Sequence, residues 1–528
     1  MFTFYWFFKR NEQFMFVFKT GDKIEKATDK EGLFKALKSV GILISFDNYS
    51  NFDKELALIL SDGKNKYLKK YLSIDLAQEI RKASIEEIGY NTKLLKASEN
   101  VFDLCMNRIE ICEHIFKERE TYFETKFDIV SEFKLNAQSI KKTIAGLASE
   151  IVKAVKQPNR PDVLIYSYDK NIPIGELPKD LVRFYEGIKA KYLNGFDETL
   201  KKQQFKMTLN GLTHTFGLGG VHSAKEKYKA DGHFLHIDAK AFYTSLIINN
   251  NWISNGIKNK ENYLNLYDKK AQYELEENPK ALIYKEVINV IFGSTKNPYS
   301  DLYDPNKFHN VTVNGQLIMA HLILILENFI EELIQTNTDG IVVRYNPEFY
   351  DLLLEIIGLW GTHYNVEVAI TKINKIHQRD VNNYIFWKEN GQTIRKGIYK
   401  EPNYLNGSMP IINETLFANA ATGIKPQDYI IEQFKTDDLS KFYFIGKKEK
   451  DQEKVVQKLA GFTDYKTLTD TVCGVATNKK KNGGLFQVKK GLYSKLRNSP
   501  ENFMNHLEAN KKQIDLNWYV DLVEKNIF

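Results

Sequence analysis

The stretch Thr336–Val343, with the sequence TNTDGIVV, places one carboxylate beside a glycine at the start of an apolar run. The Asp339-Gly340 pair favours a tight hairpin turn. The β-rich run Ile341–Val343 predicts a short strand, and the apolar segment Gln316–Glu327 upstream predicts a buried helix. From these residues alone, Asp339 either shapes a turn or holds a ligand, and partners elsewhere in the chain must decide.

The composition describes a chain large enough for several folded domains. Of its 528 residues 43% are hydrophobic, and 34 Phe with 29 Tyr argue against disorder. The cysteines Cys105, Cys112 and Cys473 form no C-x-x-C pair, so we expect a reducing, cytoplasmic location. The N-terminus lacks a signal-peptide layout. Without an apolar run of about 18 residues we expect no membrane span.

The positive charge is concentrated at one end of the chain. The whole chain has 74 Lys and Arg against 67 Asp and Glu, for a net charge of +7. The segment from Lys441 to Phe528 holds 17 of the basic and 10 of the acidic residues, which accounts for the entire excess. A basic segment suits a polyanion, because phosphate contacts release counterions. A lysine-rich surface turned to water is the equal alternative.

A second stretch carries another isolated aspartate. In His236–Ile247, with the sequence HIDAKAFYTSLI, a predicted strand ends at Asp238, and Tyr243 follows five residues later. On its own, Asp238 fits an ordinary cap of the following helix.

A third stretch, Tyr284–Gly293 (YKEVINVIFG), predicts a helix with a row of residues on one face. Lys285, Asn289 and Phe292 are spaced i, i+4 and i+7. Gly293 completes the row without a side chain, so a ligand could approach its backbone closely. An amphipathic helix that ends in a glycine cap is the structural alternative.

In this order the three stretches resemble motifs A, B and C of the family B DNA polymerases: D-x-x-S-L-Y-P-S, K-x-x-x-N-S-x-Y-G and D-T-D-S. The N-T-D-G form of motif C is similar to that of some bacteriophage members. The segment Phe216–Gly220 (FGLGG) resembles the glycine-rich Y-x-G-G element of that family. The chain departs from motif A at Ala241, Phe242 and Thr244, and from motif C at Asn337 and Gly340.

The resemblance implies an α/β multi-domain fold of the right-hand polymerase type, preceded by a ribonuclease-H-like, exonuclease-type domain. Its implied segments are residues 1–130 for the exonuclease-like domain, 131–230 for a helical connection and the start of the palm, 231–255 and 301–385 for the palm, 256–300 for the fingers, and 386–528 for a basic thumb region. It also implies a bacterial host cell as the location.

The resemblance further implies a nucleotidyl-transfer site with two Mg²⁺ ions, or Mn²⁺ in their place. Asp238 and Asp339 match the catalytic, metal-binding aspartates, and the carbonyl of Ala239 would add an oxygen ligand. Magnesium prefers carboxylates and substrate phosphates, and two ions stabilise the attacking and leaving oxygens. Asn337 offers a neutral oxygen where the family has a carboxylate.

Other matched residues would bind nucleotide and DNA. Lys285 is a point charge for the incoming triphosphate, and Tyr243 lies where the family excludes a 2′-hydroxyl group. Asn289 and Gly293 would lie near the nascent base pair. The expected contacts with the DNA are Gly219, Gly220, Lys388, Arg395, Lys396 and Tyr399.

The first domain lacks acids with which relatives hold metals for proofreading. The Asp-x-Glu of the family falls on Thr3 and Tyr5, which supply no anionic oxygen at neutral pH. Asp53 is retained in a segment similar to the second exonuclease motif, and Glu110 stands for the aspartate of the third. We therefore expect no 3′→5′ exonuclease activity. An unrelated first domain is the alternative.

The implied function is a template-directed DNA polymerase that extends a primer–template with deoxynucleoside triphosphates and works with accessory replication proteins. One alternative is a template-independent or defence-related polymerase on the same fold. Another is a catalytically silent nucleic-acid-binding protein. Two neighbouring carboxylates disfavour the silent protein, because they repel each other unless a cation neutralises them.

Overall fold

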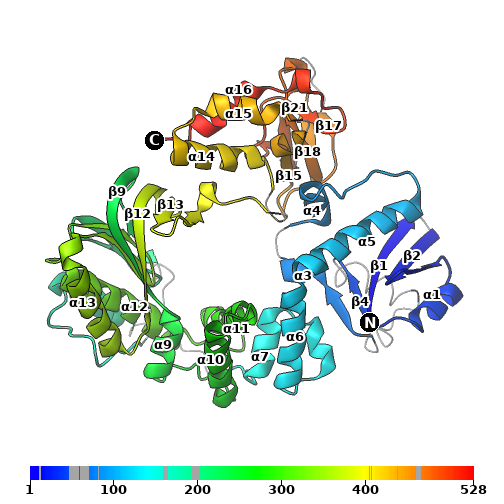
Figure 1. The fold of residues 1–528 in the computed structure, drawn as a ribbon. Coiled ribbons are helices and arrows are strands. Elements are labelled where there is room, and N and C mark those ends of the chain that lie inside the picture. The colour runs from blue at the N-terminus through cyan, green and yellow to red at the C-terminus, as the bar shows by residue number, and fades with distance from the viewer. Residues whose placement is uncertain are drawn as a thin grey trace. The chain divides into compact units, whose positions relative to one another are not determined.

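The computed structural model describes residues 1–10, 13–46, 59, 71–80, 83–157, 165–192, 202–403, 405, 407–436, 438–459 and 465–528. The chain is mixed α/β and forms two compact units (Figure 1). The terminal unit combines Met1–Thr143 with Lys400–Ile527, and the central unit holds Ile144–Tyr399 together with Phe528. The finer division into palm, fingers and thumb stays a prediction.

The N-terminal part of the terminal unit is a five-stranded mixed sheet of order β3-β2-β1-β4-β5. The strands are β1 Phe2–Arg10, β2 Gln13–Thr20, β3 Lys23–Ala27, β4 Ile42–Ser45 and β5 Ser73–Asp75. The first three pair antiparallel, whereas β4 and β5 run parallel to β1. Alternation along β2 directs Phe16 and Phe18 into the core with α1 (Lys30–Leu37) and Val17 into a second core with α5 (Val101–Glu118).

The rest of the terminal unit consists of helices and two small antiparallel sheets. The helices are α3 Leu76–Ile80, α4 Ile85–Asn91, α6 Glu120–Glu132, α14 Pro410–Thr422, α15 Pro426–Phe434 and α16 Leu516–Glu524. The sheets, in strand order, are β15 Phe444–Lys447, β18 Thr471–Ala476 and β21 Phe503–Asn505, then β17 Tyr465–Thr467, β16 Lys454–Lys458, β19 Leu485–Lys489 and β20 Leu492–Lys495. Helix α4 joins the two parts, because it contacts β15 and β18 and its Glu87 carboxylate lies 2.7 Å from the Lys447 ammonium.

The central unit is built on a seven-stranded antiparallel sheet of order β14-β13-β12-β9-β11-β10-β8. Its strands are β8 Ser223–Ala224, β9 Tyr228–Ala239, β10 Glu332–Thr336, β11 Gly340–Arg344, β12 Val368–Asp380, β13 Asn383–Lys388 and β14 Thr393–Lys396, and a hairpin of β6 Phe205–Leu209 and β7 Leu212–Phe216 lies beside them. The strands predicted to end near Asp238 and to begin near Ile341 are confirmed. Strands β13 and β14 belong to this sheet. Residues 386–399, which the resemblance assigns to the thumb segment, therefore lie in the central unit.

Seven α-helices complete the described part of the central unit (Figure 1). They are α7 Ile144–Ile151, α8 Lys179–Tyr192, α9 Phe242–Asn249, α10 Lys260–Leu275, α11 Lys280–Ser294, α12 Pro305–Leu326 and α13 Tyr350–Tyr364. The predicted helices over the Lys285 row and upstream of TNTDG are confirmed as α11 and α12. Helix α12 contacts both α9 and α13 and forms the centre of the helical layer.

Helix α12 is long and apolar enough to cross a membrane by length and composition, but 83% of its apolar window is buried inside the protein. It also carries buried amides that bind neighbouring loops. The Asn310 and Asn314 side-chain oxygens accept from the backbone N–H groups of Ser167 and Asp169, both at 2.8 Å. These polar contacts are those of a core helix that positions loops around it.

Candidate active site

The structure brings Asp238 and Asp339 together. Asp238 lies near the end of β9, directly opposite Gly340 of β11, and Asp339 is the residue before that glycine. The Ala239 N–H donates to the Asp339 carbonyl at 2.7 Å, and the Asn337 N–H donates to the Gly340 carbonyl at 2.7 Å. The two aspartates are about a hundred positions apart in the sequence. They lie at the same edge of the sheet, Asp238 near the end of β9 and Asp339 just before the start of β11.

Gly340 allows this close approach. A Cβ atom at this position would lie 2.6 Å from the Ile237 carbonyl oxygen and 3.1 Å from a carboxylate oxygen of Asp238. Both values are shorter than ordinary contacts, and the first involves backbone that cannot swing aside. Its φ is outside the left-handed region, so close packing against β9, and not turn geometry, requires the glycine. This accounts for one departure from motif C.

The two carboxylates repel each other in a partly buried setting. Burial and the neighbouring Asp339 raise the pKa of Asp238 to about 6, and Lys285 opposes this rise. A carboxylate with a raised pKa beside a second carboxylate fits a cation, because a metal ion would neutralise both charges. The two carboxylates are oxygen donors of the kind that Mg²⁺ or Mn²⁺ prefers.

Helix α11 presents its predicted row toward these acids. Lys285 is exposed, and its influence on the pKa of Asp238 places its charge near that carboxylate. Asn289 is exposed one turn further on. Phe292 lies with its ring 5.1 Å from the Tyr243 ring, edge to face. A Cβ at Gly293 would meet nothing within 4 Å, so its surface is open to a ligand.

Tyr243 is wedged between two helices. Besides Phe292, it contacts Gly315 of α12, where an added Cβ would lie 2.9 Å from the Tyr243 ring. Burial raises its pKa, and the Asp339 charge adds to the rise. Ala241, between Asp238 and Tyr243, has a left-handed backbone with φ of 48° and begins α9. This turn leads the chain directly from the acid at the strand end to the tyrosine.

The glycine-rich segment packs against the turn that carries Asp339. A Cβ at Gly220 would lie 2.3 Å from the Thr338 hydroxyl oxygen, so only glycine fits there. The Gln316 amide nitrogen on α12 donates to the carbonyls of Gly217 and Gly219 at 2.8 and 2.7 Å. Gly219 is itself exposed. The two glycines proposed for DNA contact thus also support the site.

The four remaining DNA-binding candidates fall into two groups. Lys388, Arg395 and Lys396 lie on β13 and β14, where the Lys396 ammonium is 5.6 Å from the Tyr384 ring and Lys388 lowers the pKa of His236. Tyr399 is different, because it is only 1% exposed and its hydroxyl lies 3.2 Å from His377 Nε2. In this arrangement Tyr399 supports the sheet and offers no surface to DNA.

Three residues near the site were missed by sequence reasoning: His222, Gly315 and Tyr384. The His222 Nε2 atom lies 3.3 Å from the Thr338 hydroxyl, and burial lowers its pKa, with a hydrogen bond to Asn337 opposing. Burial raises the pKa of Tyr384, and both aspartates add to that rise. These residues come from separate elements, so no local spacing marks them, and they converge only when the strands pair.

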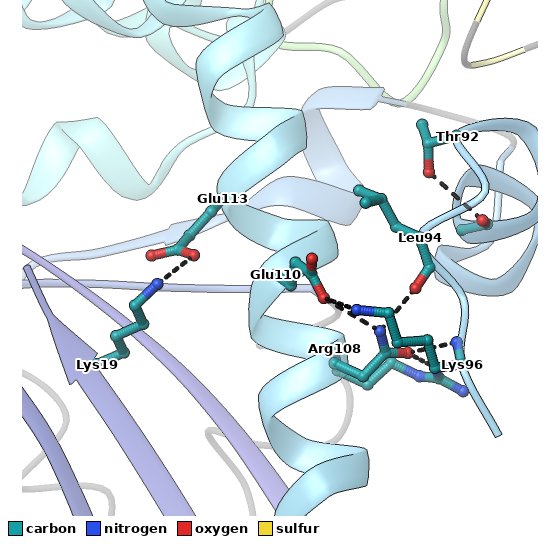
Figure 2. A network of polar contacts seen from close by, with 9 residues as sticks. Lys19, Thr92, Leu94, Lys96, Arg108, Glu110 and Glu113 are labelled. Carbon is teal, nitrogen blue, oxygen red and sulfur yellow. Dashed lines mark hydrogen bonds and ion pairs between the residues drawn. The ribbon is translucent and has the colours of Figure 1, made fainter. Parts of the chain in front are cut away.

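The expected exonuclease positions hold no acid pair in the described part of the chain. Thr3 is fully buried, with its hydroxyl 2.8 Å from that of Thr20, and Tyr5 is 1% exposed. Figure 2 shows Glu110 on α5 beside Lys96, whose ammonium lies 3.2 Å from its carboxylate. The same view shows Glu113 beside Lys19 at 2.7 Å. Asp53 lies outside the described residues.

No protein-family model matches the chain, and no curated protein matches it. Among solved structures it is similar to the family B DNA polymerase from the hyperthermophilic archaeon Pyrobaculum calidifontis. The sequence identity is 11% and the TM-score 0.49, over 98% of this chain and 76% of that chain. A likeness of this size carries no conclusion about activity, so the function is argued from the geometry of the site.

Proposed function

We propose that the chain is a DNA polymerase that extends a primer by metal-dependent nucleotidyl transfer along a template. The observation that carries the proposal is the pairing of β9 with β11, which sets Asp238 against Gly340 and Asp339, with Lys285 close enough to lower the pKa of Asp238. Transfer of a nucleotide from a triphosphate requires paired carboxylates to hold metal ions and a positively charged side chain, here Lys285, near the phosphates.

Each residue has one task in this proposal. Asp238, Asp339 and the Ala239 carbonyl would hold Mg²⁺, which stabilises the attacking 3′-oxygen and the leaving pyrophosphate when bound. Lys285 binds the triphosphate of the incoming nucleotide. Tyr243, fixed by Phe292 and Gly315, lies where it can exclude a 2′-hydroxyl. The exposed Asn289 and the open Gly293 lie further along the same helix, where the base pair would form.

Primer extension tests the proposal. With a labelled primer–template, Mg²⁺ and four deoxynucleotides, we expect Asp339→Asn and Asp238→Asn to lower the rate by about a thousandfold, because each loses several kcal/mol of transition-state stabilisation. Asp231→Asn is the matched control, because Asp231 is an exposed acid on the same strand. Wild-type extension without any template would favour the template-independent polymerase, and an unaffected Asp339→Asn variant would refute the assigned site.

We further propose that the terminal unit performs no proofreading. The mixed sheet with parallel β1, β4 and β5 supports a ribonuclease-H-like fold, but Thr3 and Tyr5 are buried without charge at its first strand. Incubation with labelled single-stranded DNA and Mg²⁺ should leave the DNA at full length. Shortening that is lost in Asp53→Asn would show a nuclease site.

A further inference from the structure

The four-stranded sheet of the terminal unit has one aromatic face that no part of the proposed active site uses. Tyr465 of β17 lies opposite Lys458 of β16, and Tyr493 of β20 lies opposite Val488 of β19. Directly opposed residues project from the same side of a sheet. We call this side of the sheet the tyrosine face. It also carries Phe486 of β19, a strand that lies between β17 and β20 in the sheet order.

The two tyrosines form a stack across the sheet. Their ring centroids are 4.1 Å apart with an angle of 20° between the planes, and Phe486 meets Tyr465 edge to face at 6.1 Å. Tyr493 remains 47% exposed. A stacked pair of rings, one of them half open to solvent, is a rigid platform for another flat ring.

On the opposite side, the two middle strands β16 and β19 are fixed inside the unit. Val455, Leu485 and Gln487 are buried there. The Gln457 amide nitrogen on the same side donates to the Phe503 carbonyl at 2.8 Å. The tyrosine face is therefore held in place from behind. Val456 and Val488 also project from the tyrosine face and are 1% and 3% exposed, so this side of the sheet is only partly open to solvent.

Positive charge is concentrated in this part of the chain. From Lys454 to Arg497 the chain has ten Lys and Arg and two Asp and Glu. Lys454 and Lys458 are exposed on the tyrosine face and have no carboxylate partner among the described residues. The Lys458 ammonium lies 5.9 Å from the centroid of the Tyr465 ring. A half-exposed aromatic ring on a sheet face that also carries two exposed lysines matches the stacking surfaces and phosphate contacts of single-strand binders.

We propose that the tyrosine face binds single-stranded nucleic acid, with an unpaired base stacked on Tyr493 and phosphates bound by Lys454 and Lys458. A duplex hides its base faces inside the stack, so it could use only the lysines. The interaction needs neither Asp238 nor Asp339 and is separate from nucleotidyl transfer.

Fluorescence anisotropy of the full chain with a labelled oligothymidylate, without divalent ions or nucleotides, tests the proposal. We expect Tyr493→Ala to weaken single-strand binding by about tenfold, because stacking of one base contributes roughly 1–3 kcal/mol. Tyr493→Phe should retain most of the affinity, because it keeps the ring. Lys454→Gln with Lys458→Gln should lower the dependence of affinity on salt.

Leu492→Ala is the matched control. Leu492 precedes Tyr493 on β20 and is 76% exposed, but it projects from the other side of the sheet. Its replacement should leave binding unchanged. Equal binding by wild type and Tyr493→Ala would overturn the proposal, as would an equal loss for single strand and duplex. Primer extension by the same wild-type sample shows separately whether the proposed polymerase activity exists.

Discussion

The central sheet and the N-terminal sheet place very different residues on their key strands. In the central unit, β9 and the turn before β11 bring two carboxylates together, and the pKa of Asp238 rises as a result. In the terminal unit, β1 carries Thr3 and Tyr5, both buried. Repelling acids lower the stability of a fold, whereas a paired hydroxyl and an aromatic ring support a core. Between β1 and the β9–β11 pair, the contrast favours the β9–β11 pair as the place for a cation.

The largest effect is expected when a carboxylate is introduced on β1 at Thr3, because this position is fully buried. We expect Thr3→Asp to destabilise the terminal unit by about 3–5 kcal/mol, because it buries a charge without a partner. Faster hydrogen exchange of the β1 and β4 amides would report the loss. Thr3→Val is the control and should cost about 1 kcal/mol, for the lost hydrogen bond to Thr20. If Thr3→Asp were as stable as Thr3→Val, the position would be open to solvent or cation.

The next largest effect is expected where β9 and β11 touch. A Cβ at residue 340 meets the Ile237 carbonyl at 2.6 Å, so Gly340→Ala must separate the strands. A displacement near 1 Å between catalytic groups can cost about a hundredfold in rate, and we expect that loss in primer extension. Gly358→Ala is the control for the same reaction, because its Cβ meets no atom within 4 Å and Gly358 has no part in the proposed site. Wild-type activity in Gly340→Ala would mean that the spacing of the two acids is not critical.

How much of this was predictable differs between the two sheets. The central motifs predicted the end of one strand at Asp238, the start of another at Ile341 and the helical row of Lys285, since hydrophobic period and a polar break mark each one locally. The roles of Gly220 and Gly315 were not predictable, because each depends on a side chain that another element brings to it. Tyr399 matched the DNA-binding segment in sequence. Its burial follows from its position after β14, where its hydroxyl meets the His377 side chain of β12, and no local pattern marks that contact.

A smaller effect is expected behind Tyr243. Gly315→Ala would place a Cβ 2.9 Å from the tyrosine ring and push the ring away from α12, which would change its position in the proposed sugar site. We expect the KM for deoxynucleotides to rise about tenfold, equivalent to roughly 1.4 kcal/mol of binding, with little change in kcat. Gly358→Ala is the control, because Gly358 also lies within a helix and its added Cβ meets nothing. A fall in kcat and thermal stability with unchanged KM would assign Gly315 a purely structural role.

The smallest expected effect concerns the stability of the unliganded site. The pKa of Asp238 is about 6 in the folded chain against 3.8 ordinarily, so the folded state holds this proton more tightly than the unfolded state. The stabilising contribution is therefore complete below pH 3.8 and is lost as the pH rises through 6. Replacing Asp238 by a neutral residue should therefore restore this stability at higher pH.

We thus expect Asp238→Asn, without divalent ions at pH 8, to be more stable than wild type by about 1–2 kcal/mol, after discounting for partial exposure. Thermal unfolding at pH 8 and again below pH 3.8 measures the difference, which should vanish at the lower pH. Asp231→Asn should show no such gain, because Asp231 is exposed on the same strand. Added Mg²⁺ should stabilise wild type and not Asp238→Asn, because only an intact pair of carboxylates binds it. If Asp238→Asn were more stable than wild type by the same amount at both pH values, repulsion from Asp339 would not be the cause of the gain. The contrast between the two sheets would then not be electrostatic.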